Sequence, residues 1–492
     1  MIASPANAAA AIEPVHPYPP RYWWLTRLSA AGVLIVLALA GVRWWWGTHA
    51  ERRLNALIDE AHARGERIVV TDYQGKPFLP DDQNAAFYYK RAAQTLKTTK
   101  AEEWAIDNAA QLPLRQDIFD TIGAALKTNA KPLADLREGR RHRQADWGVN
   151  VISPMWSVLL PHLNHSRWLA IISRTAGMHA MQRGDHAEAV DRVRDIHALT
   201  DSLDDSDMFL VTHLVQVGIE SLAADAAAEI AIDLQVQGAD VSATTQPVAT
   251  PASREQVAAL IARLLNDGPL RRSLQDALQG ERAGQVDIGI NVANRVLMVR
   301  PAIQLDAADL AEEGGRAMKA AANKDWRAAQ AQWPAPPPPI DGPRAVNHVV
   351  SLSVRPALGR VVRTNMRAAA NSRLAAVALA IRLYQLDHAG QRPPTLDALV
   401  PKYLPAVPGD PFNADAPLGY VADPKDPYVY SVGENGLDDS AATKPWRPDA
   451  TVLDPLKAPD LFLRLTRNNA PPAEVSDPPE PEPTTAPAAT QP

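Results

Sequence analysis

The chain has 492 residues, 46% of them hydrophobic, which is enough apolar material for about two or three packed domains and excludes a wholly disordered protein. Its formal net charge at pH 7 is only −6, so it lacks the overall basic field that holds nucleic acid through its phosphates. The absence of cysteine excludes disulfides, thiolate nucleophiles, zinc–thiolate sites and iron–sulfur clusters.

A leader and a membrane-spanning helix are the first predicted elements. Residues 1–20 are rich in alanine and proline and should be disordered. From Leu28 to Val42 every residue is apolar or small, and tryptophans flank this stretch on both sides. Trp44 lies 20 positions after Trp24, which on a helix is about 30 Å, the thickness of a bilayer's hydrocarbon core. Residues 21–46 are therefore predicted to be a transmembrane anchor whose partner is the lipid bilayer.

A cleaved signal peptide is the alternative for this segment. Thr48-His49-Ala50 offers a small-residue cleavage site, but a run of three tryptophans just ahead of it fits cleavage poorly. The arginines near the segment stand on both of its sides, at Arg21, Arg27, Arg43, Arg52 and Arg53. The positive-inside rule therefore says little about orientation.

The body of the protein is expected to be mainly helical. The pattern from Glu51 to Arg64 should continue the anchor as a helix, and the β-branched stretch and Gly-containing turn from Ile68 to Pro80 are compatible with one short hairpin. Residues 51–235 as a whole are predicted to form a helical domain, with about six helices after Gln83.

Within this domain, the segment from Trp168 to Leu203 predicts two amphipathic helices joined at Gly184-Asp185. The junction Gly-Asp-x-x-x-Ala resembles that of a tetratricopeptide-type hairpin. No second copy follows at the period of that repeat, so a single helical hairpin is favoured over a solenoid. Small residues would allow its helices to pack closely, at Ala176, Ala180, Ala187 and Ala189.

Two linkers and a second helical segment follow. Residues 236–252 form a polar linker, after which Ser253 and Gln256 have the spacing of a capping box that begins a helix. Residues 253–332 are predicted to be helical, with breaks at Gly268-Pro269 and Gly314-Gly315. Residues 333–343 are rich in proline and predict a stiff spacer, with binding of a Pro-rich-ligand domain as a less favoured alternative.

Residues 344–445 are predicted to form a long helix and a small α+β module. The helix should be kinked at Pro356 and should end near His388-Ala389-Gly390. One face of it is apolar, at Leu374, Val377, Ala378, Ile381 and Tyr384.

The exit from this helix carries an ordered set of turns and strands. A Gly/Pro turn is followed by Leu396 and Leu399 on a short helix, then by Asp410-Pro411-Phe412, a strand around Tyr420 and the strand Tyr430-Ser431-Val432-Gly433 leading into an Asn-Gly loop. This region resembles the C-terminal region of type II secretion pseudopilins, especially the major one. Similar modules are familiar at the ends of uncharacterised membrane-anchored bacterial proteins with helical bodies.

The resemblance implies a helix packed on a small antiparallel sheet, lying outside the cytoplasmic membrane. Pseudopilins begin with a processed leader and a Phe-led apolar helix that has a glutamate at its fifth position, and this chain has neither. Assembly into a pilus-like filament is therefore not expected.

In the pseudopilin family the final loop can bind calcium. Here Glu434, Asp438 and Asp439 supply the oxygen ligands that calcium prefers, but the loop diverges after Asp439 and a solvated acidic turn is favoured. Residues 446–492 are predicted to be a disordered Pro-rich tail, with one short helix possible from Asp460 to Leu465.

No sequence motif for catalysis is present: there is no Walker loop, GxGxxG, GxSxG, HExxH or EF-hand pattern. His162 and His165 are three residues apart, so on a helix they could share a metal, and four more histidines follow at His179, His186, His197 and His213. No carboxylate beside the first pair completes a familiar ligand set. Surface or capping histidines are favoured over a metal site, and the chain is expected not to be an enzyme.

Seven arginines and no acidic residue lie between Arg344 and Leu386. The favoured interpretation is pairing with an acidic helix that carries Asp306, Asp309, Glu312 and Glu313. Contact with anionic lipid headgroups is the second interpretation. Nucleic-acid binding is the third, because this helix lacks the aromatic residues that single strands stack on.

Together these patterns predict a mainly α protein with helical hairpins, one N-terminal transmembrane helix and a small C-terminal α+β pseudopilin-like module. We expect a membrane-anchored, non-catalytic scaffold or interaction protein, its body outside the cytoplasmic membrane and other envelope proteins as its partners. One alternative is an accessory component of a secretion or pilus-like system. Another is an extracytoplasmic metal-dependent hydrolase that uses His162 and His165.

Overall fold

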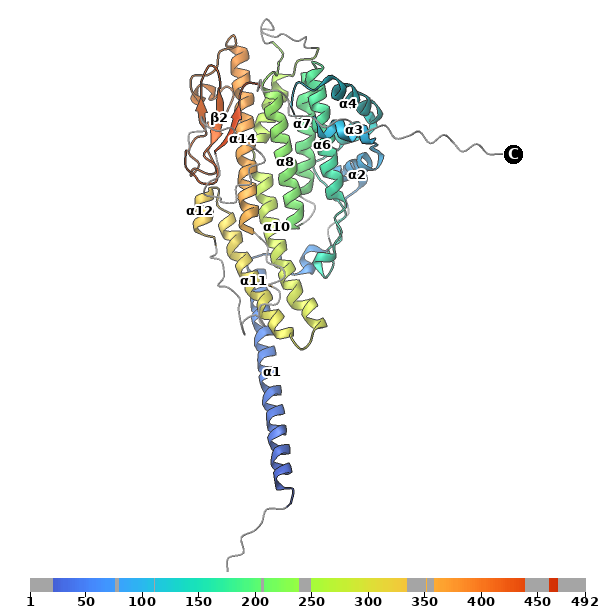
Figure 1. The fold of residues 1–492 in the computed structure, drawn as a ribbon, viewed down its shortest axis with the longest axis vertical. Coiled ribbons are helices and arrows are strands. Elements are labelled where there is room, and N and C mark those ends of the chain that lie inside the picture. Colours follow the sequence, from blue (N-terminus) through green and yellow to red (C-terminus); the bar gives the residue numbers. More distant parts are fainter. Residues whose placement is uncertain are drawn as a thin grey trace, which may run out of the picture.

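The computed structural model describes residues 21–75, 79–109, 111–204, 208–238, 249–333, 351, 358–438 and 460–467. In these residues the protein is mainly helical, as expected, and carries one small three-stranded sheet. A long N-terminal helix leaves the lower end of a body built from upright helices (Figure 1).

Helix α1 (Trp23–Ala63) runs without interruption from the apolar stretch into the body. Among the described residues it is the one helix long and apolar enough to cross a membrane, a test that a signal sequence also passes. Its side chains are exposed along the apolar stretch, whereas Leu54, Leu57 and Ala61 are buried against the body. Gly65 follows the end of the helix, where its positive φ of 73° lets the Glu66 amide bond back to the Ala61 carbonyl.

The expected hairpin after α1 is wrong in the part that the structure describes. The 3₁₀ helix η1 (Val70–Tyr73) lies there instead, and no strand forms in 68–75. The Asp72 carboxylate accepts hydrogen bonds from the amides of Ile68 and Val69, at 2.8 and 3.0 Å. In a hairpin these amides would donate to carbonyl groups of a second strand. Here they donate to the Asp72 side chain instead, which makes the local 3₁₀ turn an alternative to strand pairing.

Seven α-helices make up the next part of the body, close to the number expected. They are α2 (Ala85–Thr95), α3 (Lys100–Asp107), α4 (Gln116–Thr128), α5 (Ala130–Gly139), α6 (His162–Gln182), α7 (His186–Asp204) and α8 (Leu210–Ala231). The first two begin at side-chain caps, since Asn84 accepts from the Ala86 amide and Thr99 from the Glu102 amide.

Helices α6 and α7 form the helical hairpin that the sequence predicts. Gly184 at the turn has a φ of +85°, and the Asp185 carboxylate accepts a hydrogen bond from the Glu188 amide at the start of α7. Ala180 and Ala189 are buried between the helices. The ends of the polar linker pack on this turn, since the Thr250 amide bonds to the Gly184 carbonyl.

Helix α9 (Arg254–Leu264) begins at the predicted capping box, and α10 (Gly268–Asp287) begins at the predicted break. The second predicted break is wrong, because α11 (Arg300–Ala321) passes through Gly314 and Gly315. A Cβ on Gly314 would lie 2.7 Å from Cγ of Arg282, so the glycine makes room for the side chain of α10. These glycines therefore serve helix packing and do not end a helix. The short helix α12 (Trp326–Ala331) follows.

The C-terminal part consists of α14 (Leu358–Asp387), the 3₁₀ helix η8 (Leu396–Leu399) and the sheet. Four residues of the apolar stripe of α14 are buried and Tyr384 is half-buried. The helix ends where expected, and Pro356 lies outside the described residues. The strands β1 (Gly419–Val421), β2 (Tyr428–Ser431) and β3 (Leu461–Arg464) pair antiparallel in the order β1-β2-β3, with Val429 opposite both Tyr420 and Leu463.

Strand β3 corrects the expectation of a short helix from Asp460 to Leu465. Its residues pair with β2, and the following Arg467 forms ion pairs with Glu229 and Asp233 near the end of α8. The chain thus returns to the sheet after the predicted end of the module at residue 445. Pairing with β2 supplies the long-range contacts that decide between strand and helix here.

Asp410 holds the Asp-Pro-Phe turn against the sheet. Its carboxylate is buried and accepts hydrogen bonds from the Phe412 amide at 2.9 Å, the Ser431 hydroxyl at 2.7 Å and the Val432 amide at 2.8 Å. The ring of Phe412 is fully buried beside it. One carboxylate therefore ties the turn to the end of β2.

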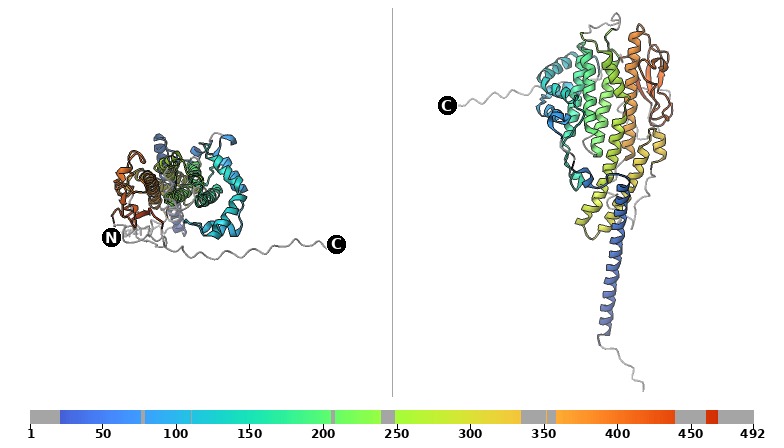
Figure 2. Two further views of the ribbon diagram at one scale, coloured as in Figure 1. Left: turned by 90° about the horizontal axis from the view of Figure 1, so that it is seen from above. Right: turned by 180° about the vertical axis from the view of Figure 1, so that it is seen from behind.

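One hydrophobic core connects the parts of the body. Its buried residues come from α2 through β3, so the predicted segments 51–235, 253–332 and 344–445 all contribute to it. Seen from above, the sheet lies on one side of the long helices and α2 to α5 curve around the other side (Figure 2).

Candidate functional site

The histidines do not form a common site. Five of the six candidates are buried, which corrects the expectation of surface histidines; they are His162, His179, His186, His197 and His213. His162 stacks on Trp147, with ring centroids 5.0 Å apart, whereas His165 is exposed. Within the described residues, no group of three or more histidine, aspartate or glutamate side chains is placed to hold a metal ion.

Each of the other buried histidines has its own partner. His179 stacks on Phe119. Nδ1 of His186 accepts a hydrogen bond from the Gln235 amide at 2.8 Å, and Nδ1 of His213 lies 3.0 Å from the Ser273 hydroxyl. Burial lowers the pKa of His186 to about 4 and that of His213 to about 3. Both rings are therefore neutral at pH 7.

The acidic loop is split between different partners. The Glu434 carboxylate lies between Arg363 and Arg367 of α14, at 3.4 and 3.2 Å, and its side chain is only 9% exposed. Asp438 accepts a hydrogen bond from the Tyr430 hydroxyl at 2.9 Å, and Asp439 lies outside the described residues. The expectation of a fully solvated acidic turn is therefore wrong for Glu434, whose carboxylate is held by two guanidinium groups.

The arginines of α14 do not pair with the acidic face of α11 in the described residues. Besides the two on Glu434, Arg373 bonds Asp267 and Asp415, and Arg382 donates to the Leu234 carbonyl. On α11, Asp309 and Glu312 pair with Arg53 of α1, and Asp306 accepts hydrogen bonds from Ser351. For Arg363, Arg367 and Arg373 the favoured interpretation is thus wrong, because Glu434, Asp267 and Asp415 supply the carboxylates; Arg344 and Arg355 lie outside the described residues.

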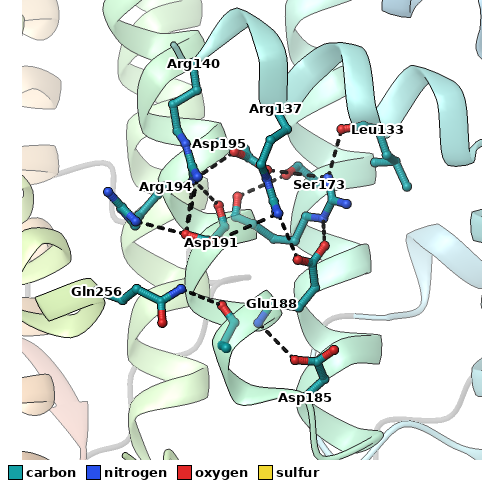
Figure 3. A network of polar contacts seen from close by, with 12 residues as sticks. Leu133, Arg137, Arg140, Ser173, Asp185, Glu188, Asp191, Arg194, Asp195 and Gln256 are labelled. Atoms are coloured by element: carbon teal, nitrogen blue, oxygen red, sulfur yellow. Dashed lines mark hydrogen bonds and ion pairs between the residues drawn. The ribbon is translucent and has the colours of Figure 1, made fainter. Parts of the chain in front are cut away.

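A dense ionic network joins α5 to α7 (Figure 3). Asp195 is fully buried and forms ion pairs with Arg137, Arg140 and Arg192, at 3.0, 2.9 and 3.4 Å. Arg137 also bonds Glu188, at 3.0 Å. Burial would lower the pKa of Arg137, but the charges of Asp195 and Glu188 outweigh it and raise the pKa. The network binds helix α5 to helix α7.

A second buried network lies on α7, α8 and α9. Nδ1 of His197 is 3.2 Å from the Glu220 carboxylate, and Arg263 bonds both Glu220 and Asp201. Burial would raise the pKa of Glu220, but the charges of His197 and Arg263 outweigh it and bring the pKa to about 2. The His197 and Glu220 side chains are each 2% exposed, so this pair is closed to a substrate.

An open charged cleft lies between α1, α10 and α11, with a volume of about 580 Å³. Its charged side chains largely pair with one another, since Arg64 and Arg282 both bond Glu66. Arg316 and Lys319 also line it. The mixture of both signs gives the cleft a polar character without the single-sign field of an anion site.

An apolar groove of about 440 Å³ lies between α6 and α8. Val211 and Leu214 on its wall are 50% and 42% exposed, and at Gly218 a Cβ would meet no atom within 4 Å. Its other lining residues are Arg167, Ile171, Val215, Ile219 and Leu222. An exposed apolar surface of this kind can bury apolar side chains of another molecule.

The sequence predicted neither the charged cleft and the apolar groove nor the two buried ionic networks. One signal was available, since Glu220 stands in a largely apolar part of α8, and an acid buried on a helix requires a cation. No protein-family model, curated protein or solved structure matches this chain.

Proposed function

We propose that this protein is a membrane-anchored, non-catalytic scaffold that binds other envelope proteins. The observation that carries the proposal is the single helix α1, whose first part is apolar and exposed while its last part is packed in the body. A helix that is continuous across both parts transmits the position of the membrane to the body without a flexible joint. A cleaved signal peptide would instead leave Leu54, Leu57 and Ala61 on a separate, shorter helix.

The body is proposed to lie outside the cytoplasmic membrane, in accord with the resemblance of its C-terminal region to type II secretion pseudopilins. Support comes from the packing of α14 against an antiparallel sheet, the arrangement that the resemblance implies. Attachment to a secretion or pilus-like system is the second candidate, favoured by the same arrangement.

The groove between α6 and α8 is the proposed binding surface. Val211 and Leu214 expose apolar side chains there, and Gly218 leaves space between the helices. A partner that inserts an apolar helix would bury these side chains and would gain about 25 cal/mol for each Å² of apolar surface removed from water.

Two experiments test the proposal. Carbonate washing of membranes should leave the full-length chain in the pellet, and protease added to intact spheroplasts should digest the body. Recovery of the chain in the carbonate wash contradicts the membrane anchor. Protection of the body from the added protease contradicts the proposed orientation.

The groove is tested by placing a photoreactive amino acid at Leu214 and, as a control on another face, at Lys131. Adducts with a defined envelope protein should form from Leu214 and not from Lys131. A Gly218→Leu change should fill the groove and abolish those adducts while the chain stays folded. Equal adducts from both positions contradict a specific binding groove, and adducts with pseudopilins would select the secretion-system alternative.

A further inference from the structure

The turn between α10 and α11 exposes a run of apolar residues. It comprises the π-helical turn η5 (Ile288–Val292), the 3₁₀ turn η6 (Ala293–Arg295) and the residues up to Arg300. In the segment Val296-Leu297-Met298 the side chains are 46%, 67% and 87% exposed. Such a run is unfavourable in water and marks a surface that contacts something apolar.

This turn lies at the point where α1 leaves the body. Helices α10 and α11 reach down to that level beside α1 (Figure 1). Higher up, Arg300 and Arg53 form ion pairs with Glu51 and Asp309, so α11 runs alongside α1 in the same direction. The turn before Arg300 is therefore on the side of α1 nearest its apolar stretch.

A hydrogen bond between α1 and the turn places the turn relative to the predicted membrane boundary. The Arg43 guanidinium donates to the Leu297 carbonyl, and Arg43 directly follows Val42, the last residue of the apolar stretch. An arginine side chain is about 7 Å long, about the rise of five helical residues. The Arg43 guanidinium lies beside Gly47, so Leu297 is about one helical turn beyond the boundary at which α1 would leave the hydrocarbon, close to the interfacial tryptophans.

We infer that the α10–α11 turn is a second, interfacial contact with the bilayer, in which Val296, Leu297 and Met298 enter the boundary between headgroups and acyl chains. The Arg43 bond favours this, because an arginine at the edge of the apolar core needs hydrogen-bond acceptors and the turn supplies one. Arg295 is exposed beside the apolar run, where its charge would reach the lipid phosphates. The protein would thus contact the membrane at two places, α1 and this turn. The second contact would prevent the body from rotating freely about α1.

This inference rests on the proposed anchor, and its test separates the two. The natural chain has no cysteine, so a single cysteine can carry an environment-sensitive fluorophore at a chosen position. The variants are Leu297→Cys and Met298→Cys in the turn, Leu34→Cys in the apolar stretch and Leu437→Cys beside α12, which follows the opposite end of α11. Each full-length protein is reconstituted into phosphatidylcholine vesicles containing lipids with a nitroxide placed either near the headgroup or deep in the acyl chain.

The expected result is loss of fluorescence at both turn positions, stronger with the shallow nitroxide, and loss at Leu34 that is stronger with the deep one. Leu437, which is 60% exposed, should not be quenched by either lipid. Quenching at Leu34 without quenching at Leu297 and Met298 overturns the interfacial contact and leaves the anchor intact. Absence of quenching at all four positions overturns the anchor and this inference with it. Equal quenching at Leu437 and at the two turn positions also overturns the interfacial contact, because the body would then contact lipid over its surface and not through this turn.

Discussion

The ring of Tyr89 in α2 lies directly against Gly139 at the end of α5, so close that a Cβ on the glycine would be 2.4 Å from the ring. Tyr89 is 1% exposed and stacks near Trp147, which leaves its ring no free space. A Gly139→Ala change should therefore lower the free energy of unfolding by about 1–3 kcal/mol. Chemical denaturation of the detergent-solubilised protein measures this.

Gly218→Ala is the matched control for that change. Its added methyl group meets nothing within 4 Å in α8, so removal of a helix-interior glycine should leave stability unchanged or raise it by up to about 1 kcal/mol. Equal losses from the two alanine variants would mean that the contact between Tyr89 and Gly139 is not tight.

Stability should fall as the pH falls below neutrality, in part because of His213 and His186. Burial holds their folded pKa values at about 3 and about 4, whereas an unfolded histidine has a pKa of about 6.5. Between these values the unfolded chain binds protons that the folded chain does not. Stability is therefore lost as the pH drops through this window, by about 1.4 kcal/mol per pH unit for each histidine.

The His213→Asn variant removes the proton that His213 takes up when the chain unfolds. The free energy of unfolding, measured from pH 7 to pH 4.5, should depend on pH less steeply than in the natural protein, by about one proton. The carboxylates contribute equally to both proteins and cancel in the comparison. An unchanged slope would show that His213 is protonated in the folded state.

Removal of Asp195 should be strongly destabilising. Its buried carboxylate is shared by Arg137, Arg140 and Arg192, and an Asp195→Ala change leaves those cations with fewer counter-charges. We expect a loss of about 3–5 kcal/mol, read from the denaturation midpoint. The control is Glu138→Gln, which breaks the exposed pair with Arg141 and should cost at most about 1 kcal/mol. Similar effects from both changes would contradict a special role for the buried network.

Asp410→Ala should loosen the C-terminal sheet. Three buried donors lose their acceptor, and each donor left unpaired costs about 1–3 kcal/mol, so the lower bound on the loss is about 3 kcal/mol. We expect faster amide hydrogen exchange in β2 and a loss of about 3 kcal/mol. An Asp423→Ala change, in an exposed turn, should have a smaller effect. Protection of β2 that survives the loss of Asp410 would show that the turn is held by Phe412 instead.

The sequence determined the local elements with a clear pattern. The apolar run and its tryptophans predicted the exposed part of α1, Ser253 and Gln256 the start of α9, and Gly184 the turn of the α6–α7 hairpin. These features depend on residues close together in the chain, so local sequence suffices to decide them.

Only the tertiary structure decided the partners of charged and small residues. The Gly314-Gly315 pair resembles a helix break until Arg282 is seen to pack on it, and Glu434 resembles a calcium ligand until Arg363 and Arg367 are placed beside it. The same is true of strand β3, whose conformation comes from its pairing with β2. Contacts of this kind join residues far apart in the chain, and no local pattern in the sequence records them.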